Sequence, residues 1–460
     1  MAKIIQIFPN KNGVQSISQT TEYIQSAIDE CFLAGGGTVE IQAGEYNIGS
    51  IRIRSNVTIK LCKDARLIAS RNTEDYFCVE KDTLEPIDRS QISDVRWIPM
   101  EDRTPEDRYS WINTIGSTWN HAIIRAVDAH NIAVIGEEGS EIDGSDCYDP
   151  LGEEYYRGPH GINIHNSTDI TLRGYSIKNT GNWAHCICDS SNITITDLTI
   201  SGGHDGIDIL ACSNVDINRC TFFTGDDCVA GYGSRDVEVA HCSMNTACSA
   251  FRIGGFRINI HDNVLYGPAK YLFRGSLTLE EKIAGKPRLI DNAADKDHRY
   301  NMLSAVTYFA ADGLEIKDRP GDIIIKDCIF KNVDRFVHYN FSGNEPWQKC
   351  KPLHDITFEN IKASGIKLPF TLYGDPDERI TAEFENVSIE FSPDYKSEAV
   401  INTCYYDKIL LDNVQVSNPP KYLIKKWSND GDIIVDDATL KGFSEPFEVD
   451  ATEEFKCDWI

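Results

Sequence analysis

Four aspartates are the residues of this chain whose types and spacing are best suited to chemistry. They are Asp205, Asp208, Asp226 and Asp227, in the glycine-containing segments 203–208 and 224–228. Carboxylates crowded into one patch repel one another, which raises the pKa of one of them and keeps it protonated. A protonated and an ionised carboxylate together can cleave a glycosidic bond, because one protonates the leaving oxygen and the other activates water or attacks carbon. The alternative, turn formation by Asp and Gly, explains one such segment more easily than two in succession.

A repeat of about 22 residues indicates what positions these aspartates. Copies start at Asn192, Asn214 and Asp236, at a constant step, and each continues with alternating β-branched residues. This period with strand chemistry is typical of one coil of a β-solenoid. Residues one period apart stack, so we expect these three residues to form a polar ladder, and Cys220 and Cys242 to stack inside. Asp205 and Asp226 are also about one period apart, so they should lie on neighbouring coils, about 4.8 Å apart along the stacking direction.

The ends and interruptions of the repeat suggest one solenoid domain over residues 1–460 with a cap at about 1–50. A helix capped by Thr20 or Thr21 is expected before the triple glycine 35–37, and it would cover the open edge of the first coil. Its apolar face is formed by Ile24, Ala27, Ile28 and Cys31. The repeat is interrupted at about 76–120 and 268–320, and such insertions commonly form functional loops.

The net charge and the cysteines indicate which kinds of partner and which cellular compartment to expect. The formal net charge of −26 disfavours nucleic acid and anionic lipid as partners. An acidic sugar substrate would need basic residues concentrated at the site. The 15 cysteines include no CxxC pair and no Cys/His spacing typical of zinc, so we predict no metal and no cofactor. Buried free thiols favour a reducing compartment, the cytoplasm. No signal peptide or transmembrane segment is visible, but a secreted or periplasmic chain whose leader had been removed would look the same.

Specific motifs along nearly the whole chain resemble glycoside hydrolase family 28, the polygalacturonases and their relatives. The resemblance is carried by the N-terminal helix with its triple glycine and by short segments at 43–46, 141–144, 182–183, 205–208 and 225–228. It implies an all-β, right-handed parallel β-helix with an N-terminal capping helix. It also implies hydrolysis with inversion, with Asp226 as general acid and with Asp205 and Asp227 activating water. A separation of about 6.5–9.5 Å between the carboxyl groups would agree with inversion.

The chain departs from the family pattern at three signatures, and the last two departures bear on the expected substrate. The signature Asn-Thr-Asp is reduced to its aspartate in segment 203–205, and Cys248 replaces the histidine of Gly-His-Gly. The Arg-Ile-Lys signature has no match at its usual place, and we interpret segment 257–259 as strand. Arg252 and Arg274 are the candidate cations for a substrate carboxylate, which a guanidinium can hold by two hydrogen bonds. An ordinary structural arginine is an equal alternative for each.

Several further residues are candidates for substrate binding. They are His204, which adjoins Asp205, together with Asp208, Cys248 and Trp183. Aromatic rings offer flat apolar surfaces to sugars, and the other candidates of this kind are Trp111, Trp119, Tyr155 and Tyr156. For each aromatic residue, packing is the more common role, and a histidine in a turn often has no catalytic task.

The combined expectation is a hydrolase of pectic oligosaccharides or polysaccharides, of the galacturonan or rhamnogalacturonan type. The two insertions suggest attack from a chain end, which rapid early loss of polymer viscosity would contradict. One alternative is a lyase or epimerase of the same fold, with calcium held among the aspartates. The other is a carbohydrate-binding β-helix without catalysis, which would leave the clustered carboxylates unexplained.

Overall fold

The computed structural model of the chain describes residues 3–9, 16–76, 118–285, 301–310, 320–343, 350–428, 431–443 and 446–449. The chain divides into two compact units. Unit 1 comprises Met1–Asp226 and Tyr271–Ile290, and unit 2 comprises Asp227–Lys270 and Asp291–Ile460. Each unit is described separately below. Whether residues 1–460 act as one domain stays a prediction.

Unit 1 is built from three ladders of parallel strands, with β1 (Lys3–Ile7) paired to β2. The first ladder contains β2 (Gly37–Ile41), β5 (Val57–Leu61), β8 (His130–Gly136), β11 (Thr168–Arg173), β14 (Ser191–Thr196) and β17 (Ser213–Asn218). The second contains β4 (Ile51–Arg52), β7 (Ala122–Val127), β10 (His160–His165), β13 (His185–Cys188) and β16 (Ile207–Leu210). The third contains β3 (Gly44–Ile48), β6 (Ala65–Ala69), β9 (Glu141–Asp143), β12 (Ser176–Lys178), β15 (Thr199–Gly202) and β18 (Thr221–Thr224).

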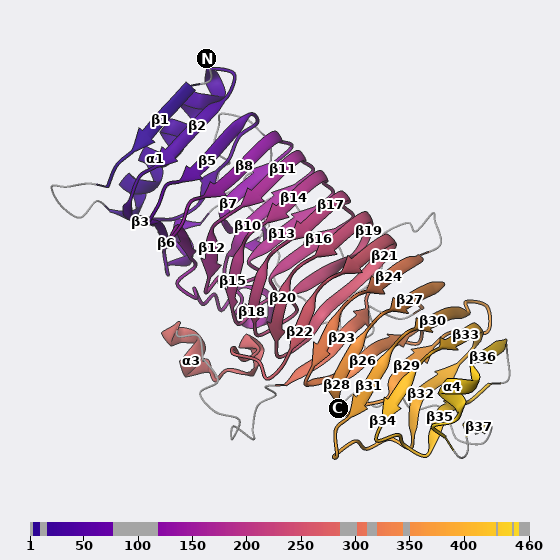
Figure 1. Cartoon of the computed structure of the whole chain (residues 1–460). Helices are drawn as coiled ribbons and strands as arrows, with labels where there is room; N and C mark the ends of the chain where they lie inside the picture. The colour runs from indigo at the N-terminus through magenta and orange to yellow at the C-terminus, as the bar shows by residue number, and fades with distance from the viewer. Residues whose placement is uncertain are drawn as a thin grey trace. The chain divides into compact units, whose positions relative to one another are not determined.

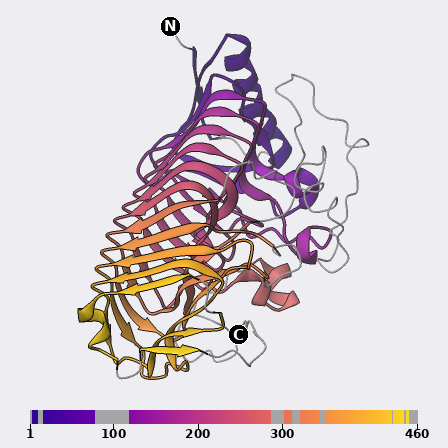
Figure 2. The same cartoon turned by 90° about the vertical axis from the view of Figure 1, so that its right-hand side faces the viewer.

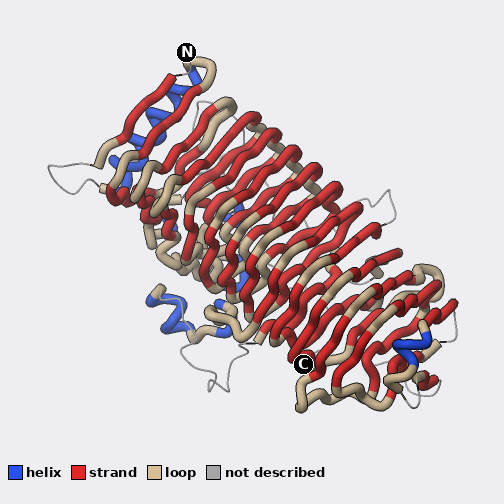
Figure 3. Tube along the Cα trace, in the orientation of Figure 1, coloured by secondary structure: helices blue, strands red, loops and turns tan. Residues whose placement is uncertain are grey.

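Unit 2 repeats this arrangement, starting with the long strands β19 (Val229–Ala240) and β21 (Ser249–His261). One ladder continues through β23 (Met302–Tyr308), β26 (Val333–Asn340), β29 (Phe370–Tyr373), β32 (Ala399–Cys404), β35 (Tyr422–Lys426) and β37 (Phe447–Val449). Another continues through β24 (Gly321–Lys326), β27 (Asp355–Glu359), β30 (Ile380–Glu385), β33 (Tyr406–Asp412) and β36 (Asp432–Val435). The third contains β20 (Ser243–Thr246), β22 (Val264–Tyr266), β25 (Ile329–Lys331), β28 (Lys362–Ile366), β31 (Ser388–Phe391) and β34 (Gln415–Ser417). Each unit is therefore a parallel β-helix, as predicted, and strands dominate both (Figure 3).

The predicted polar ladder is present at the turns of unit 1. The Asn214 side-chain amide donates to Asn192 Oδ1 at 3.1 Å, and the Asn192 amide donates to Asp169 Oδ1 at 3.0 Å. All three residues have a positive φ of 56–58°, which Asn and Asp adopt more readily than other side chains. In unit 2, Asp236 accepts instead from Arg257, at 2.6 Å from Nε and 2.9 Å from Nη2. Arg257 lies within β21, so the interpretation of segment 257–259 as strand is confirmed.

Helix α1 (Ile17–Leu33) lies beside the first strands of unit 1 (Figure 1, Figure 2). Its N-cap is Ser16, which forms a capping box with Gln19, so the predicted cap at Thr20 or Thr21 is wrong. Both threonines lie inside the helix, because the hydroxyl of Ser16 already satisfies a free amide of the first turn. The predicted apolar face is confirmed, since Ile24, Ala27, Ile28 and Cys31 are all buried.

The other helices among the described residues are short. They are α3 (Leu279–Ala284) and α4 (Asp437–Leu440), with the 3₁₀ turns η1 (Thr73–Asp75), η4 (Thr118–Asn120), η5 (Glu153–Tyr155) and η6 (Arg274–Ser276). None of the described helices combines the length and the apolar composition that a bilayer crossing needs. The described cysteines form no disulfide, and all of them except Cys62 and Cys350 are buried. The prediction of buried free thiols is therefore confirmed for this part of the chain.

A histidine inside unit 1 makes its stability sensitive to acid. His185 is fully buried, its Nε2 lies 3.0 Å from the Tyr175 hydroxyl, and its Nδ1 lies 3.0 Å from the Gly206 carbonyl oxygen. Burial lowers the pKa of His185 from 6.5 to about 4. The unfolded chain therefore binds this proton at a higher pH than the folded chain does.

We expect the free energy of unfolding to fall by about 3 kcal/mol on account of His185 as the pH falls from 6.5 to 4. Above pH 6.5 this contribution is fully present, and below pH 4 this group causes no further loss. Urea titrations at a series of pH values measure it. His185→Gln should show a shallower dependence than the wild type, while the exposed-site variant His241→Gln should not. An unchanged slope in His185→Gln would show that this histidine does not contribute.

Candidate active site

Two turns of unit 1 carry Asp205 and Asp226. Strand β15 ends at Gly202 and β18 ends at Thr224, these residues are register partners, and the Gly225 amide donates to the Gly202 carbonyl at 2.7 Å. Asp205 and Asp226 therefore come from neighbouring coils, as predicted. In this register, however, the position equivalent to Asp226 is His204 rather than Asp205. The Thr224 hydroxyl closes the second turn by donating to the Asp226 carbonyl at 2.7 Å.

Arg157 connects these two turns and was not identified from the sequence. Its Nη2 lies 3.5 Å from Asp226 Oδ2, and its Nη1 lies 3.0 Å from His204 Nδ1 and 3.2 Å from Asn182 Oδ1. Its Nε donates to Glu154 Oε2 at 2.9 Å. The Arg157 side chain is only 6% exposed, so its charge acts where water screens it weakly. Arg157 therefore holds the Asp226 carboxylate and the His204 ring in fixed positions.

Glu154 balances the charge of Arg157. It belongs to η5, where its φ of 53° is in the left-handed region. Burial would raise the pKa of Glu154, but the charge of Arg157 and the hydrogen bond from it outweigh this effect, so the pKa lies below its usual value. An ionised Glu154 keeps the buried guanidinium neutralised without requiring Asp226 for that purpose.

His204 is positioned as a neutral, buried ring. It is 3% exposed and stacks on Tyr156, with ring centroids 6.0 Å apart and planes within 15°. Burial, followed by the charge of Arg157, lowers the pKa of His204 well below 6.5. A neutral ring whose Nδ1 accepts from Arg157 carries its proton on Nε2. The role predicted for His204, tuning Asp205 or contacting a sugar, stays a prediction.

Lys282, in α3 of the second insertion, adds another cation. Its Nζ lies 4.1 Å from the centre of the Tyr156 ring and 3.3 Å from the Gly275 carbonyl oxygen. Burial lowers the pKa of Lys282, with a smaller effect from Arg274. Lys282 is half-buried, so it remains accessible to a solute. Arg157 and Lys282 thus place two cations around Tyr156 near Asp226.

Asp205 and Asp208 are the other predicted site residues on this side of unit 1. Asp205 is 7% exposed, and its carbonyl accepts from the Ala184 amide at 2.9 Å. This bond ties the aspartate's backbone to the coil before it. Asp208 is 2% exposed within β16, where its register partner is Cys186. The predicted role of Asp208 in substrate binding stays a prediction.

Asp227 and Arg252 lie together in unit 2. The Ser249 amide donates to Asp227 Oδ1 at 2.8 Å, and Arg252 Nη1 lies 3.8 Å from Asp227 Oδ2. A backbone donor and a guanidinium both favour a negatively charged carboxylate. The Arg252 side chain is 27% exposed and its guanidinium lies 4.5 Å from the centre of the Phe309 ring. It therefore has the exposure that the predicted contact with a substrate carboxylate needs.

Cys248 is at the end of the turn that precedes β21. It is 8% exposed, and its backbone amide donates to the Thr246 hydroxyl oxygen at 3.0 Å. Its carbonyl accepts from the Leu303 amide at 3.0 Å. These contacts fix the backbone of the segment in which Cys248 replaces the histidine of the family pattern. Its predicted role in substrate binding stays a prediction.

The structure places Arg274 differently from our expectation. We predicted a cation that faces the substrate, but Arg274 is 1% exposed and its guanidinium is ion-paired with the buried Asp146. Its amide also donates to the Gly203 carbonyl at 2.8 Å. Burial lowers the pKa of Arg274 to about 9, which still leaves it charged at neutral pH. Arg274 is thus a structural cation that fixes the turn before Asp205, because η6 packs directly on Gly203.

The aromatic candidates differ in the solvent exposure of their side chains. Trp183 is half-buried and lies edge-on to Trp119, with ring centroids 4.9 Å apart. Trp119 and Tyr156 are 6% and 4% exposed, so packing accounts for both. Tyr155 is 60% exposed, and together with Trp183 it keeps ring surface that a sugar could contact. The other candidate, Trp111, lies outside the described residues.

Comparisons with known proteins show which family this chain is similar to. Residues 112–249 match the model of glycosyl hydrolases family 28. The chain is 31% identical over 264 residues to an endopolygalacturonase of Emericella nidulans, covering 54% of this chain and 62% of that protein. The segment that matches the family 28 model, residues 112–249, includes Asp205, Asp226 and Asp227, so the three candidate catalytic residues all fall within the match.

The chain is also similar to a second curated relative and to a solved structure. A polygalacturonase of Saccharomyces cerevisiae is 29% identical over 150 residues, covering 30% of this chain and 41% of that protein. The chain thus spans 41% and 62% of the length of the two curated relatives. An exopolygalacturonase of Thermotoga maritima has a TM-score of 0.56 at 17% identity, covering 90% of this chain and 88% of that chain. This structural likeness confirms the right-handed parallel β-helix predicted for the family 28 fold.

Proposed function

We propose that this protein is a glycoside hydrolase that cleaves bonds in pectic polysaccharides or oligosaccharides. The observation that carries the proposal is that Asp205, Asp226 and Asp227 all lie within the segment that matches family 28. The curated relatives of the chain are polygalacturonases, which supports the same reaction and the same substrate class here.

The proposed chemistry uses three carboxyl groups and water. Asp226, with its side chain 13% exposed, protonates the oxygen of the leaving sugar. Asp205 and Asp227 act as bases that remove a proton from the attacking water, whose oxygen bonds to the anomeric carbon with inversion. The contacts of Asp227 with the Ser249 amide and Arg252 suit a base, because both favour its ionised form. Asp205, which is tied by its backbone to the preceding coil, supplies the second carboxyl group.

An acidic sugar fits the charges around these residues. The chain has a formal net charge of −26, so a polyanion would be repelled unless cations are concentrated locally. Lys282 in unit 1 and Arg252 in unit 2 are such cations, and each is accessible enough to meet a carboxylate. They replace the missing Arg-Ile-Lys signature in this proposal, and Arg274 has no part in it.

Lys282→Gln should raise KM for an acidic oligosaccharide by about 10-fold or more with little change in kcat, because a charged hydrogen bond to the substrate is lost. The same variant should change KM much less for a carboxyl-reduced or methyl-esterified form of that oligosaccharide. Lys63→Gln, at a 61% exposed side chain paired with Glu138, is the control and should behave as wild type. An equal rise in KM for the charged and the uncharged substrate would rule out recognition of the carboxylate by Lys282.

The proposed function is tested by incubating the protein with galacturonan and rhamnogalacturonan oligosaccharides of defined length. Reducing ends without ultraviolet absorbance would support hydrolysis, and the substrate that responds would identify the sugar. Release of single terminal units would support the exo action suggested by the insertions, whereas mixed lengths would indicate internal cleavage. Products that absorb in the ultraviolet would mean a lyase. Binding without turnover on every substrate would mean a carbohydrate-binding protein.

A further inference from the structure

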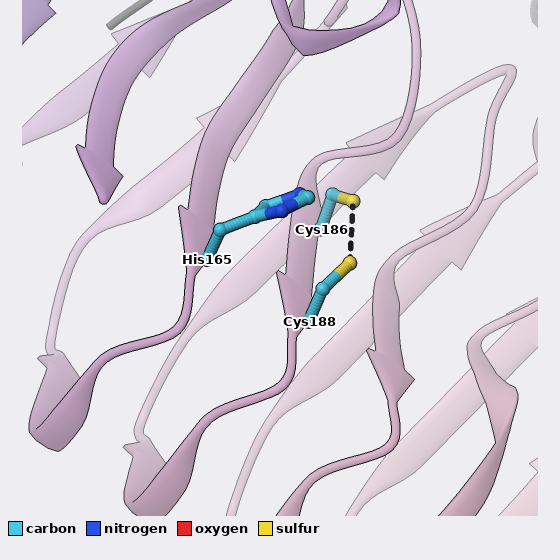
Figure 4. Close-up of side chains that lie close together, drawn as sticks. All are labelled: His165, Cys186 and Cys188. Carbon is cyan, nitrogen blue, oxygen red and sulfur yellow. Dashed lines mark hydrogen bonds between the residues drawn. The ribbon is translucent and has the colours of Figure 1, made fainter. Parts of the chain in front are cut away.

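Three side chains with metal-ligating atoms meet on the second ladder of unit 1, apart from the carboxylates described above. His165 ends β10 and is the register partner of Cys188 in β13, and Cys186 lies two residues before Cys188 on the same face of the strand. A ring nitrogen of His165 and the two sulfur atoms all lie within 4.8 Å of one another. Figure 4 shows the two sulfur atoms facing each other beside the imidazole ring.

We propose that His165, Cys186 and Cys188 form a binding site for a thiophilic metal ion, and that zinc is the ion that fits best. The Sγ atoms of Cys186 and Cys188 are 3.8 Å apart. Two thiolates bound to one tetrahedral zinc at about 2.3 Å would lie about 3.8 Å from each other. The backbone therefore already holds the sulfur atoms at the separation that zinc needs. The three protein ligands leave a fourth position for water or another small ligand.

His165 has a buried nitrogen that suits this role. The residue is 8% exposed, and its Nε2 has no hydrogen-bond partner among the described residues. A buried polar atom without a partner is costly, and a bond to a metal would remove that cost. Burial, followed by the charge of Arg125, lowers the pKa of His165 well below 6.5. The ring is therefore neutral at physiological pH, which is the form that binds metals.

The charges around the two thiols are compatible with zinc. A hydrogen bond with Cys186 and then burial raise the pKa of Cys188 well above its usual value, so without a cation Cys188 keeps its proton. Binding of Zn²⁺ would displace the protons of the two thiols, and two thiolates with a neutral imidazole would leave the site uncharged. A neutral complex suits a site near Arg125, whose charge opposes a cation, and near Cys212 and Asp189. Calcium and magnesium, which prefer oxygen ligands, are not expected to bind here.

His165, Cys186 and Cys188 could have two other roles, and each would give a different experimental result. Buried thiols can simply pack as small apolar groups, in which case no metal is retained. Cys186 and Cys188 could instead form a disulfide on oxidation, which would remove two electrons and two protons to an oxidant. The sequence alone did not suggest the site, because the Cys-x-Cys pair has no neighbouring histidine at a spacing typical of zinc along the chain.

The test is metal analysis of the full chain, purified under reducing conditions, loaded with Zn²⁺ and dialysed into metal-free buffer. We expect zinc to be retained in a one-to-one ratio, and Co²⁺ loaded in its place to give thiolate-to-cobalt absorbance. Cys188→Ala and His165→Ala should weaken zinc binding by more than about 10-fold. Cys220→Ala, at a buried thiol outside the cluster, should bind zinc as wild type does.

Thermal unfolding gives a second measurement that does not depend on the variants. A chelator should lower the Tm of the zinc-loaded wild type, since the metal binds only the folded site, and should not lower the Tm of Cys188→Ala. The proposal is overturned if the wild type retains no zinc, if Cys188→Ala and His165→Ala retain it fully, or if mass spectrometry finds a Cys186–Cys188 disulfide in the reduced preparation. Each of these results can be obtained whether or not the protein hydrolyses pectin.

Discussion

Asp226→Asn is expected to lower the rate of sugar release by about 10²–10⁴-fold, the usual contribution of a general acid. The amide keeps the size of the carboxyl group, so Arg157 can remain in place while the proton donor is lost. The rate is measured as reducing ends released from the oligosaccharide on which the wild type is most active. Asp197→Asn, at a surface aspartate paired with Arg219, is the matched control and should retain the wild-type rate.

A substrate with a better leaving group distinguishes the role of the general acid from the role of the two bases. An aryl glycoside that departs without protonation should restore much of the activity of Asp226→Asn, because the missing proton is no longer needed. The same substrate should not restore Asp205→Asn or Asp227→Asn, since water activation is still required. Activity of Asp226→Asn above about a tenth of wild type on the natural linkage would show that Asp226 is not the acid.

Arg274→Met should lower the free energy of unfolding by about 3–5 kcal/mol, because it leaves the carboxylate of Asp146 buried without its cation. Both partners are almost inaccessible, at 1% and 4% exposure of their side chains. Urea unfolding followed by circular dichroism measures the loss. Arg219→Met removes an exposed pair, with side chains 55% and 44% exposed, and should cost no more than about 1 kcal/mol.

The double variant Arg274→Met with Asp146→Asn shows whether the loss comes from the pair. Its cost should be smaller than the sum of the two single costs, since removing both charges leaves neither one unpaired. If Arg274→Met unfolds like the wild type but has a raised KM for acidic oligosaccharides, the original prediction of a substrate-facing cation would be restored. Arg274 would then not be a structural cation.

The solenoid could be predicted from the sequence because every coil is formed by the same short residue pattern. A left-handed turn residue followed by alternating β-branched residues recurs at a constant step, so the ladder of Asn192 and Asn214 was foreseeable from two copies. The aspartate segments could be found for the same reason, since they interrupt that repeat with charges that no structural role requires.

The contacts around the aspartates could not be predicted, because they come from segments outside the repeat. Arg157 follows an irregular turn, and only the fold brings it to Asp226 and His204. Arg274 was expected to face the substrate because sequence alone does not reveal that Asp146 pairs with it. The pairing of His165 with Cys188 depends on a coil that is slightly longer than the regular step of the repeat, so the period alone does not align these two residues.

The central claim, hydrolysis by these aspartates with inversion, is tested most directly by following a digestion with proton NMR from its first minutes. The predicted result is a saturated sugar that first appears as the anomer opposite to that of the cleaved α-linkage and then mutarotates. First appearance of the anomer of the original linkage would contradict inversion. Signals of an unsaturated sugar would contradict hydrolysis itself.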